Sequence, residues 1–307
     1  MKDNIIYQQV QNWIYRNARS LDLARWQYHF EQGEKEEVIH RLTVYQNRDG
    51  GFGHALEEDS WNPNSAPIQV FRAIELLNEI GFDEKQHPII QGIMNYMDSG
   101  RDYEEGFWLN IVETNNAFPH APWWHKDDKN YGHDRFNPSA GLAGFGLYYG
   151  ERGSSLYEKC ETIVKSAAEY ILASEKLDMH VLRCFIVMIK YCRMAGITEL
   201  YDSYRVEDKL RELVKHAITW DTSVWTDSYC CKPSFFFEYR DSGFYPENMD
   251  ISDYEIDFIR RTRNQEGVWD ITWGWSGYPE QWAISKHWWK ADIAIKNVLL
   301  LRDIGGE

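Results

Sequence analysis

Apolar residues recur along most of the chain with the period of an α-helix. Residues 67–81 show the pattern clearly, with apolar side chains three positions apart at Ile68, Phe71, Ile74 and Leu77. Pro67 suits the first turn of this helix, and Gly81 suits its end. The same period predicts further helices near residues 5–18, 22–46, 86–98, 138–149, 155–173, 179–195, 205–218 and 286–304. No segment alternates as a strand would, so we expect an all-α protein of roughly ten to twelve helices.

Two short motifs predict where helices begin. The segments from Ser252 to Glu255 and from Ser155 to Glu158 each have the form of a capping box, in which the serine and the glutamate satisfy backbone N–H groups. The glycine-rich residues 141–146 follow no predicted strand, which excludes a dinucleotide-binding loop. We therefore expect these glycines to let one helix approach its neighbours closely.

Composition and charge narrow the possible functions. The 307 residues include 33 Lys and Arg against 48 Asp and Glu, and the net charge of −15 without a basic cluster argues against a nucleic-acid partner. No apolar run reaches the roughly 18 residues that a membrane helix requires, so no transmembrane segment is expected. The five cysteines form no Cys-x-x-Cys pair, and the polar start leaves no room for a signal-peptide core. These features predict a cytoplasmic protein.

Aromatic residues are unusually frequent. They make up 15% of the chain and include 14 Trp, of which eight lie between Trp220 and Trp289. Three explanations are open: an aromatic-lined cavity for a hydrophobic or cationic molecule, platforms on which sugar rings stack, or large rings that fill gaps between helices.

An internal repeat is the most informative feature of the sequence. Residues 46–53 read Gln-Asn-Arg-Asp-Gly-Gly-Phe-Gly after one predicted helix, and residues 263–269 read Arg-Asn-Gln-Glu-Gly-Val-Trp after another. Residues 105–108, Glu-Gly-Phe-Trp, form a weaker copy. Each copy has an acid, a glycine and an aromatic residue. We expect the glycine to end a helix, the acid to bond the local backbone, and the ring to plug the joint between helices.

These repeats resemble those of the terpenoid cyclase and protein prenyltransferase superfamily, which carry Gln-x-x-Asp-Gly-Gly-Phe/Trp between the helices of an α/α toroid. The resemblance is close over residues 46–81 and moderate over residues 255–305. It implies a single toroid domain over residues 1–307, with about five to six helical hairpins in two concentric rings. It also implies an enzyme that handles an isoprenoid in an aromatic-lined central cavity.

The sequence departs from this superfamily at its catalytic motifs. It lacks the Asp-x-Asp-Asp run with which class II terpene cyclases protonate their substrate, and Asp127-Asp128 lacks the last acid of the magnesium-binding Asp-Asp-x-x-Asp motif. Prenyltransferase β subunits bind zinc through an Asp, a nearby Cys and a later His. Asp227, Cys230 (or Cys231) and His287 match that order, although the first two lie one residue further apart than in the family. Zinc or magnesium is thus the cofactor that the resemblance implies, and zinc could activate a thiolate.

An acidic segment follows the first turn and contains His54, Glu57, Glu58 and Asp59. In a toroid such a segment precedes an inner helix and can face the central cavity. Neighbouring carboxylates raise each other's pKa, which suits a general acid near neutral pH. We expect Asp59 to be the acid, with Glu57 or Glu58 as its partner. His54 would tune or share the proton. The alternative is a solvated acidic loop that caps the helix at residue 67.

Further candidates come from a long predicted loop and from the tryptophan-rich segment. The loop contains His120, Trp123, Trp124, His125, Asp127, Asp128, His133 and Asp134, and it fits a substrate-covering loop, a metal site or a plain surface loop. Tryptophan faces stabilise cations by about 1–2 kcal/mol when desolvated, and they also stack on sugars. The expected substrate-binding residues are Phe52, Trp61, Trp123, Trp124, Trp269, Trp273 and Trp275.

Three functions are therefore open. The first, which the resemblance favours, is an acid-assisted terpenoid cyclase- or prenyltransferase-like enzyme with a small hydrophobic ligand. The second is a carbohydrate-active α/α-barrel hydrolase or lyase that uses two carboxylates among Glu57, Asp59, Asp127 and Asp270. The third is a toroid that binds a lipid or a protein partner without catalysis.

Overall fold

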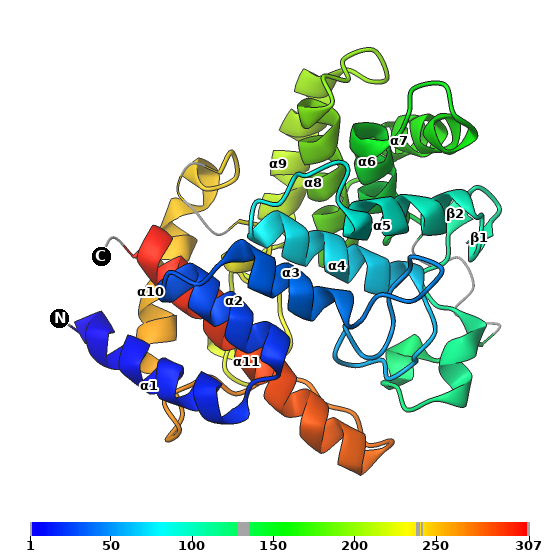
Figure 1. Ribbon diagram of the computed structural model, residues 1–307. Coiled ribbons are helices and arrows are strands. Elements are labelled where there is room, and N and C mark those ends of the chain that lie inside the picture. The colour runs from blue at the N-terminus through cyan, green and yellow to red at the C-terminus, as the bar shows by residue number, and fades with distance from the viewer. Residues whose placement is uncertain (1, 128–134, 238–239, 241, 306–307) are drawn as a thin grey trace. The chain divides into compact units, whose positions relative to one another are not determined.

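Helices dominate the structure. The computed structural model describes residues 2–127, 135–237, 240 and 242–305 (Figure 1). Within these ranges the prediction of an all-α protein is confirmed. The eleven α-helices described there are α1 (Lys2–Asn17), α2 (Ser20–Phe30), α3 (Lys35–Thr43), α4 (Pro67–Glu79), α5 (Pro88–Asp98), α6 (Ser139–Tyr149), α7 (Ser155–Ala173), α8 (Met179–Met194), α9 (Ser203–Ala217), α10 (Met249–Arg261) and α11 (Pro279–Asp303). Across the described ranges, no helix combines the length and the apolar composition that a bilayer span requires.

The chain divides into two compact units. One consists of residues 1–41 together with residues 214–307, and the other of residues 42–213. The predicted toroid and the single domain over residues 1–307 stay predictions.

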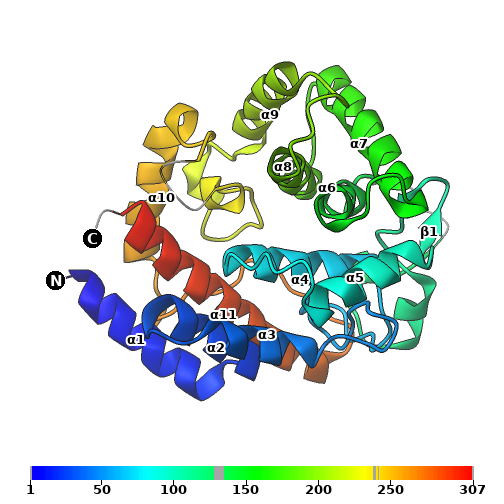
Figure 2. The ribbon, with the colours of Figure 1, turned by 45° about the horizontal axis from the view of Figure 1, so that its top comes forward.

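In the unit of residues 42–213, α6 is the buried helix and packs against α7 and α8 (Figure 2). Its glycines allow these close approaches. A Cβ at Gly144 would lie 2.6 Å from the Cα of Met188, and one at Gly146 would lie 2.5 Å from the Sγ of Cys160. The expectation that these glycines serve close helix packing is confirmed, because any side chain there would overlap a neighbouring helix.

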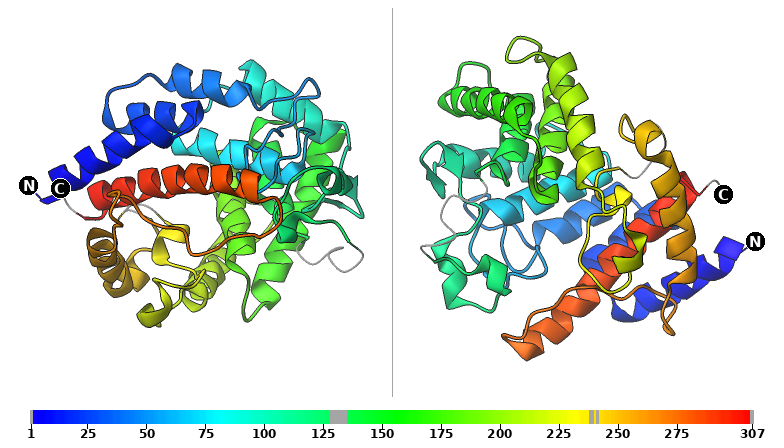
Figure 3. Two further views of the ribbon diagram at one scale, coloured as in Figure 1. Left: turned by 90° about the horizontal axis from the view of Figure 1, so that it is seen from below. Right: turned by 180° about the vertical axis from the view of Figure 1, so that it is seen from behind.

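In the other unit, α11 packs against α1 and α2, and Figure 3 shows α1 running beside α11. A buried ion network joins α2 to α11. The guanidinium of Arg25 lies 2.9 Å from a carboxylate oxygen of Asp22 and 2.9 Å from one of Asp292, and the side chains of all three residues are fully buried or nearly so. Lys296 pairs with the other oxygen of Asp292 at 2.9 Å. Each buried charge thus has an oppositely charged partner, as burial requires.

Several predicted helix boundaries are wrong. The helix predicted over residues 22–46 is interrupted, because Gln32 adopts a φ of 58° and the chain turns before α3 begins. α10 begins at Met249, so Ser252 lies inside the helix and donates to the Asn248 carbonyl instead of capping. At α7 the cap is Ser154, one residue before the predicted one; its hydroxyl accepts from the backbone N–H of residue 157. α11 begins at residue 279, seven residues before the predicted start.

The two main copies of the sequence repeat form the same backbone turn. In the first, the Gly50 N–H donates to the Asn47 carbonyl, and the Asn47 N–H donates to the carbonyl of residue 51. In the second, Gly267 and Asn264 make the corresponding bonds. Both glycines have positive φ, 86° and 85°. The expected plugging rings are confirmed, since Phe52 and its counterpart at residue 269 are buried.

The acid of the second copy and the third copy of the sequence repeat differ from expectation. In the first turn, Asp49 accepts from the Gly51 N–H at 3.1 Å, as predicted. In the second turn, Asn264 takes that role, and the acid, Glu266, pairs with Lys290. The expectation that the glycine ends a helix is wrong in all three copies. In the first two, α3 and α10 end several residues before Gly50 and Gly267. In the third, residues 105–108 belong to a hairpin between β1 (Tyr103–Glu104) and β2 (Phe107–Trp108).

Candidate functional site

The acidic segment is held in place by the turn before it and by α4 after it. A single buried side chain, Gln69 in the first turns of α4, makes two bonds to the segment. Its Oε1 accepts from the Glu57 N–H at 2.6 Å, and its Nε2 donates to the Ser60 carbonyl at 3.1 Å. The backbone of residues 57–60 is therefore fixed at both ends by one amide.

Three consecutive residues of this segment carry carboxyl groups, and we call them the carboxyl trio (Glu57, Glu58 and Asp59). Glu58 is 0% exposed and Asp59 is 2% exposed, so the alternative of a solvated acidic loop is wrong for these two residues. Glu57 is half-buried as a whole residue, but one of its carboxylate oxygens turns back and accepts from the Asp59 N–H at 2.9 Å.

Electrostatics distinguish Glu57 from an ordinary glutamate. Burial raises the pKa of Glu57 well above its usual value, and the charges on Asp59 and Glu58 raise it further. The hydrogen bond from the Asp59 N–H and the charge on Arg72 oppose this shift but do not reverse it. These surroundings favour the protonated form of Glu57 over its charged form.

An ion-pair chain leads away from the carboxyl trio along α4. Arg72, which is 6% exposed, places Nη2 3.2 Å from Oε1 of Glu58 and Nη1 3.8 Å from Oε2 of Glu75. Glu75 also pairs with Arg183 of α8. Acidic and basic side chains thus alternate from the buried loop to α8. Gln69 and Arg72 were not identified from the sequence. The available signal was two polar residues three positions apart on an otherwise apolar helix face.

His54 lies directly after the glycine turn of the first repeat copy (residues 46–53). It is exposed, and its Nε2 lies 2.9 Å from Oδ1 of Asn47. This hydrogen bond ties the imidazole to the repeat motif, and the role of His54 in tuning the proton of the carboxyl trio stays a prediction.

The segment of residues 119–125 lies directly beside the carboxyl trio. The Ala121 N–H donates to the Asp59 carbonyl at 2.9 Å, and the Trp61 N–H donates to the Pro119 carbonyl at 2.9 Å. These bonds form an antiparallel bridge that sets Ser60 opposite His120. His120 in turn places Nε2 3.1 Å from Nδ1 of His125. The predicted loop thus meets the acidic segment, a juxtaposition that no spacing in the sequence indicates.

The other residues of that loop have different surroundings. Trp124 is buried and Trp123 is 42% exposed, while Asp127 is exposed. Asp128, His133 and Asp134 lie outside the described residues.

The predicted aromatic residues have different surroundings. Phe52 and Trp269 are buried inside the two turns, and Trp61 is half-buried next to the carboxyl trio. Trp275 is buried beside a neighbouring indole, while Trp273 stands edge-to-face between the rings of Tyr229 and Trp289, 5.2 Å from each. Trp273 and Trp275 therefore pack against other rings, which supports the gap-filling explanation for these two residues.

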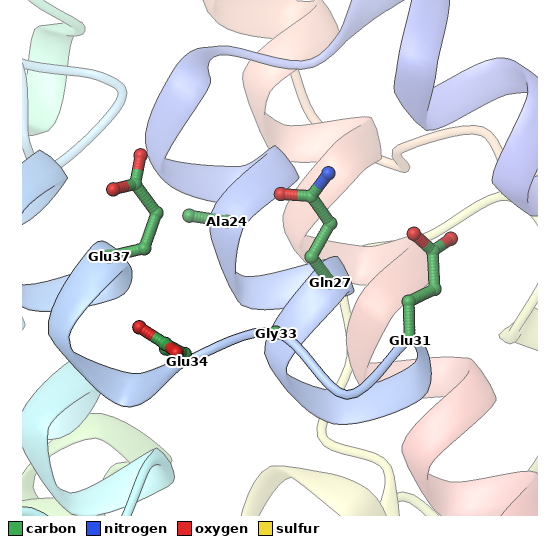
Figure 4. A pocket seen from close by; sticks show the side chains of 6 residues that line it. All are labelled: Ala24, Gln27, Glu31, Gly33, Glu34 and Glu37. Carbon is green, nitrogen blue, oxygen red and sulfur yellow. The ribbon is translucent and has the colours of Figure 1, made fainter.

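A hollow of about 280 Å³ lies between α2 and α3 (Figure 4). Its lining is acidic and polar, with Ala24, Gln27, Glu31, Gly33, Glu34 and Glu37. The Glu31 carboxylate already accepts hydrogen bonds from Tyr15, Gln11 and Trp26. No member of the carboxyl trio and none of the predicted aromatic residues lines this hollow.

The predicted zinc site does not form. Among the residues that the structure describes, no three His, Cys, Asp or Glu side chains form a group that could hold a metal ion. Of the predicted set of Asp227, Cys230 and His287, the histidine ring instead stacks on Trp13, with centroids 6.0 Å apart. Burial raises the pKa of the Cys230 thiol, which disfavours the thiolate that zinc would bind.

Asp270, a candidate for carbohydrate chemistry, is engaged in an ion pair. Its carboxylate lies 2.7 Å from the Lys290 ammonium, and the hydrogen bond from that lysine holds the pKa of Asp270 below its usual value. Asp270 belongs to the unit of residues 1–41 and 214–307, and the carboxyl trio belongs to the other unit.

No protein-family model, curated protein or solved structure matches this chain.

Proposed function

We propose that the chain is a terpenoid cyclase- or prenyltransferase-like enzyme that handles an isoprenoid by acid catalysis at the carboxyl trio. The observation that carries this proposal is Glu57, whose pKa is raised well above its usual value by burial and by the charges on two buried neighbours, Asp59 and Glu58. We assign the role of general acid to Glu57, whereas the sequence suggested Asp59.

The chemistry of such a site is proton addition to a carbon–carbon double bond. The π electrons form a new C–H bond with the Glu57 proton, the other carbon becomes cationic, and Glu57 becomes a carboxylate. Loss of a proton from the final carbocation to that carboxylate restores the acid. Negative charge held next to the developing cation lowers the barrier, because it is fixed before the reaction begins.

The surroundings fit this chemistry. Gln69 fixes the backbone of the acidic segment, which limits reorganisation during proton transfer. Trp61 lies two residues after Asp59 and is half-buried, and an indole face stabilises a desolvated cation by about 1–2 kcal/mol. The shared geometry of the two glycine turns supports the α/α toroid, because the family carries such turns between its helices.

The test combines binding with product analysis on the full chain. Thermal stability is measured with farnesyl diphosphate, squalene-like polyenes and oligosaccharides, where a ligand at about 100 times its Kd adds about 2.7 kcal/mol. Products from the prenyl substrates are then analysed for wild type, for Glu57→Gln, and for the exposed-site control Glu84→Gln. We expect a prenyl ligand to stabilise all three proteins. Product formation should fall by about 10²–10⁴-fold in Glu57→Gln alone. Stabilisation by oligosaccharides only, or an unchanged rate in Glu57→Gln, would refute the proposal.

A further inference from the structure

Two histidines of the segment of residues 119–125 meet outside the carboxyl trio. His120 places Nε2 3.1 Å from Nδ1 of His125, and the two imidazole planes are inclined by only 10°. Their ring centroids lie 5.3 Å apart, so the rings approach each other through these two nitrogens and not through their faces. Imidazole nitrogen is a preferred ligand of Zn²⁺, Cu²⁺ and Ni²⁺, and here two such nitrogens face the same gap.

We propose that Nε2 of His120 and Nδ1 of His125 form a two-histidine binding site for a divalent transition-metal ion such as Zn²⁺, with water completing the coordination. In the described part of the chain, no third His, Cys, Asp or Glu side chain joins the pair. The site is separate from the set of Asp227, Cys230 and His287 that the resemblance implies. It does not depend on the proposed function.

The buried His120 is oriented as a metal ligand. Its Nδ1 lies 2.6 Å from the Phe118 carbonyl, which can only accept, so Nδ1 carries a hydrogen. In the neutral ring this leaves the lone pair on Nε2, the nitrogen that faces His125. Metal-binding histidines commonly donate their other ring N–H to a backbone carbonyl in this way, because the bond fixes the tautomer and the ring orientation.

The backbone of His120 is held beside the acidic segment. The Ala121 N–H donates to the Asp59 carbonyl at 2.9 Å, and the antiparallel bridge sets His120 opposite Ser60. The acidic segment therefore runs directly beside the pair of histidines. Carboxylates near a site favour a bound cation over a neutral occupant.

The backbone of His125 is held by two neighbouring asparagines. Asn115 donates from Nδ2 to the Trp124 carbonyl at 3.0 Å. Asn116 bonds both polar backbone groups of Lys126: its Nδ2 donates to the carbonyl and its Oδ1 accepts from the N–H, each at 2.8 Å. The residues before and after His125 are thus fixed, and only its exposed side chain has to adjust to an ion.

The spacing of the two nitrogens is close to that required by a tetrahedral ion. Zinc–nitrogen bonds are about 2.0–2.1 Å long, so two of them at the tetrahedral angle place their nitrogens about 3.3 Å apart. The observed 3.1 Å has to widen only slightly, which a small rotation of the His125 side chain provides. In the neutral pair, the hydrogen on Nδ1 of His125 moves to Nε2 of the same ring when the ion binds. Nδ1 then supplies its lone pair, and no proton is gained or lost overall.

The experiment titrates the full chain with Zn²⁺ by calorimetry at pH 7. Wild type is compared with His120→Ala, with His125→Ala and with the control His216→Ala, which removes an exposed imidazole of α9. Wild type and the control should bind the ion with the same affinity. His120→Ala and His125→Ala should each weaken binding by at least about tenfold, since loss of even an outer partner of a metal ligand costs about 10–100-fold.

Copper identifies the ligands directly and covers the case in which His120→Ala does not fold. The electron paramagnetic resonance spectrum of the Cu²⁺-loaded protein should show coupling to two imidazole nitrogens in wild type. In His125→Ala, where the substituted residue is exposed, it should show fewer. A wild-type protein that binds no Zn²⁺ at millimolar concentration overturns the inference. A His125→Ala protein that binds as wild type, or that keeps the two-nitrogen signal, overturns it as well.

Discussion

Replacing Gly50 by Ala is expected to destabilise the unit of residues 42–213 through two separate costs. The first is conformational: Gly50 has a φ of 86°, and an L-residue loses about 1–2 kcal/mol in left-handed backbone. The second is steric, because a Cβ at this position would overlap the carbonyl oxygen of Gly92 in α5. Because the overlap is with backbone atoms, it cannot be relieved by a change of side-chain rotamer. We therefore expect overpacking to cost about 1–3 kcal/mol in addition to the conformational cost.

Other glycines of the same chain separate the two costs. Gly106 has a φ of 90°, and a Cβ there would meet nothing within 4 Å, so Gly106→Ala should show the conformational cost alone. Gly267 has a φ of 85°, and its added Cβ would lie 2.8 Å from the Cβ of Gln9, a smaller overlap than the 2.0 Å approach at Gly50. We expect Gly50→Ala to be the most costly of the three substitutions, and Gly267→Ala to lie between the other two.

The assay is urea unfolding followed by circular dichroism, in which each variant is compared with wild type at the same pH. The difference between Gly50→Ala and Gly106→Ala isolates the steric cost at the α5 contact. If these two variants lose the same free energy of unfolding, then the close approach of the turn to α5 does not constrain Gly50, and the reasoning is refuted.

Three further predictions use the same assay. Arg25→Gln should cost about 1–3 kcal/mol, because it removes the shared cation of two buried carboxylates while Arg19 still pairs with Asp22 and Lys296 with Asp292; an unchanged free energy of unfolding would contradict this. Ser154→Ala should cost about 1 kcal/mol by removing the cap of α7, whereas Ser155→Ala should cost clearly less, and the reverse order would show that the cap is misassigned. The raised pKa of Glu57 means that its proton stabilises the folded state fully below pH 4.5 and that this stability is lost as pH rises towards the folded-state pKa. Glu57→Gln should therefore flatten the decline of unfolding free energy above pH 4.5 by up to about 1.4 kcal/mol per pH unit, and an unchanged slope would rule this out.

The sequence alone determined the helical nature of the chain and the form of its glycine turns. Helical periodicity depends on residues within a few positions of one another, so residues 67–79 could be predicted from their own pattern. The turns are equally local, because a glycine with positive φ and a bonding Asn or Asp lie within six residues.

Helix boundaries were less predictable where a residue far away in the sequence bonds to a side chain that would otherwise cap the helix. Ser252 and Glu255 have the spacing of a capping box, but the Glu255 carboxylate accepts from the backbone N–H and the hydroxyl of Ser234. That partner lies 21 residues away in the sequence. α10 therefore begins earlier than its local sequence indicates.

The site shows the same division between local and tertiary information. The sequence identified the carboxyl trio as candidate chemistry, since three adjacent acids are visible as letters. It could not show that the pKa of Glu57 is raised, because that shift depends on burial and on the charges that folding brings around the group, among them Arg72 from α4. Only folding brings α4 against the loop and gives three similar carboxyl groups three different environments, and a pKa is a property of the environment as much as of the residue.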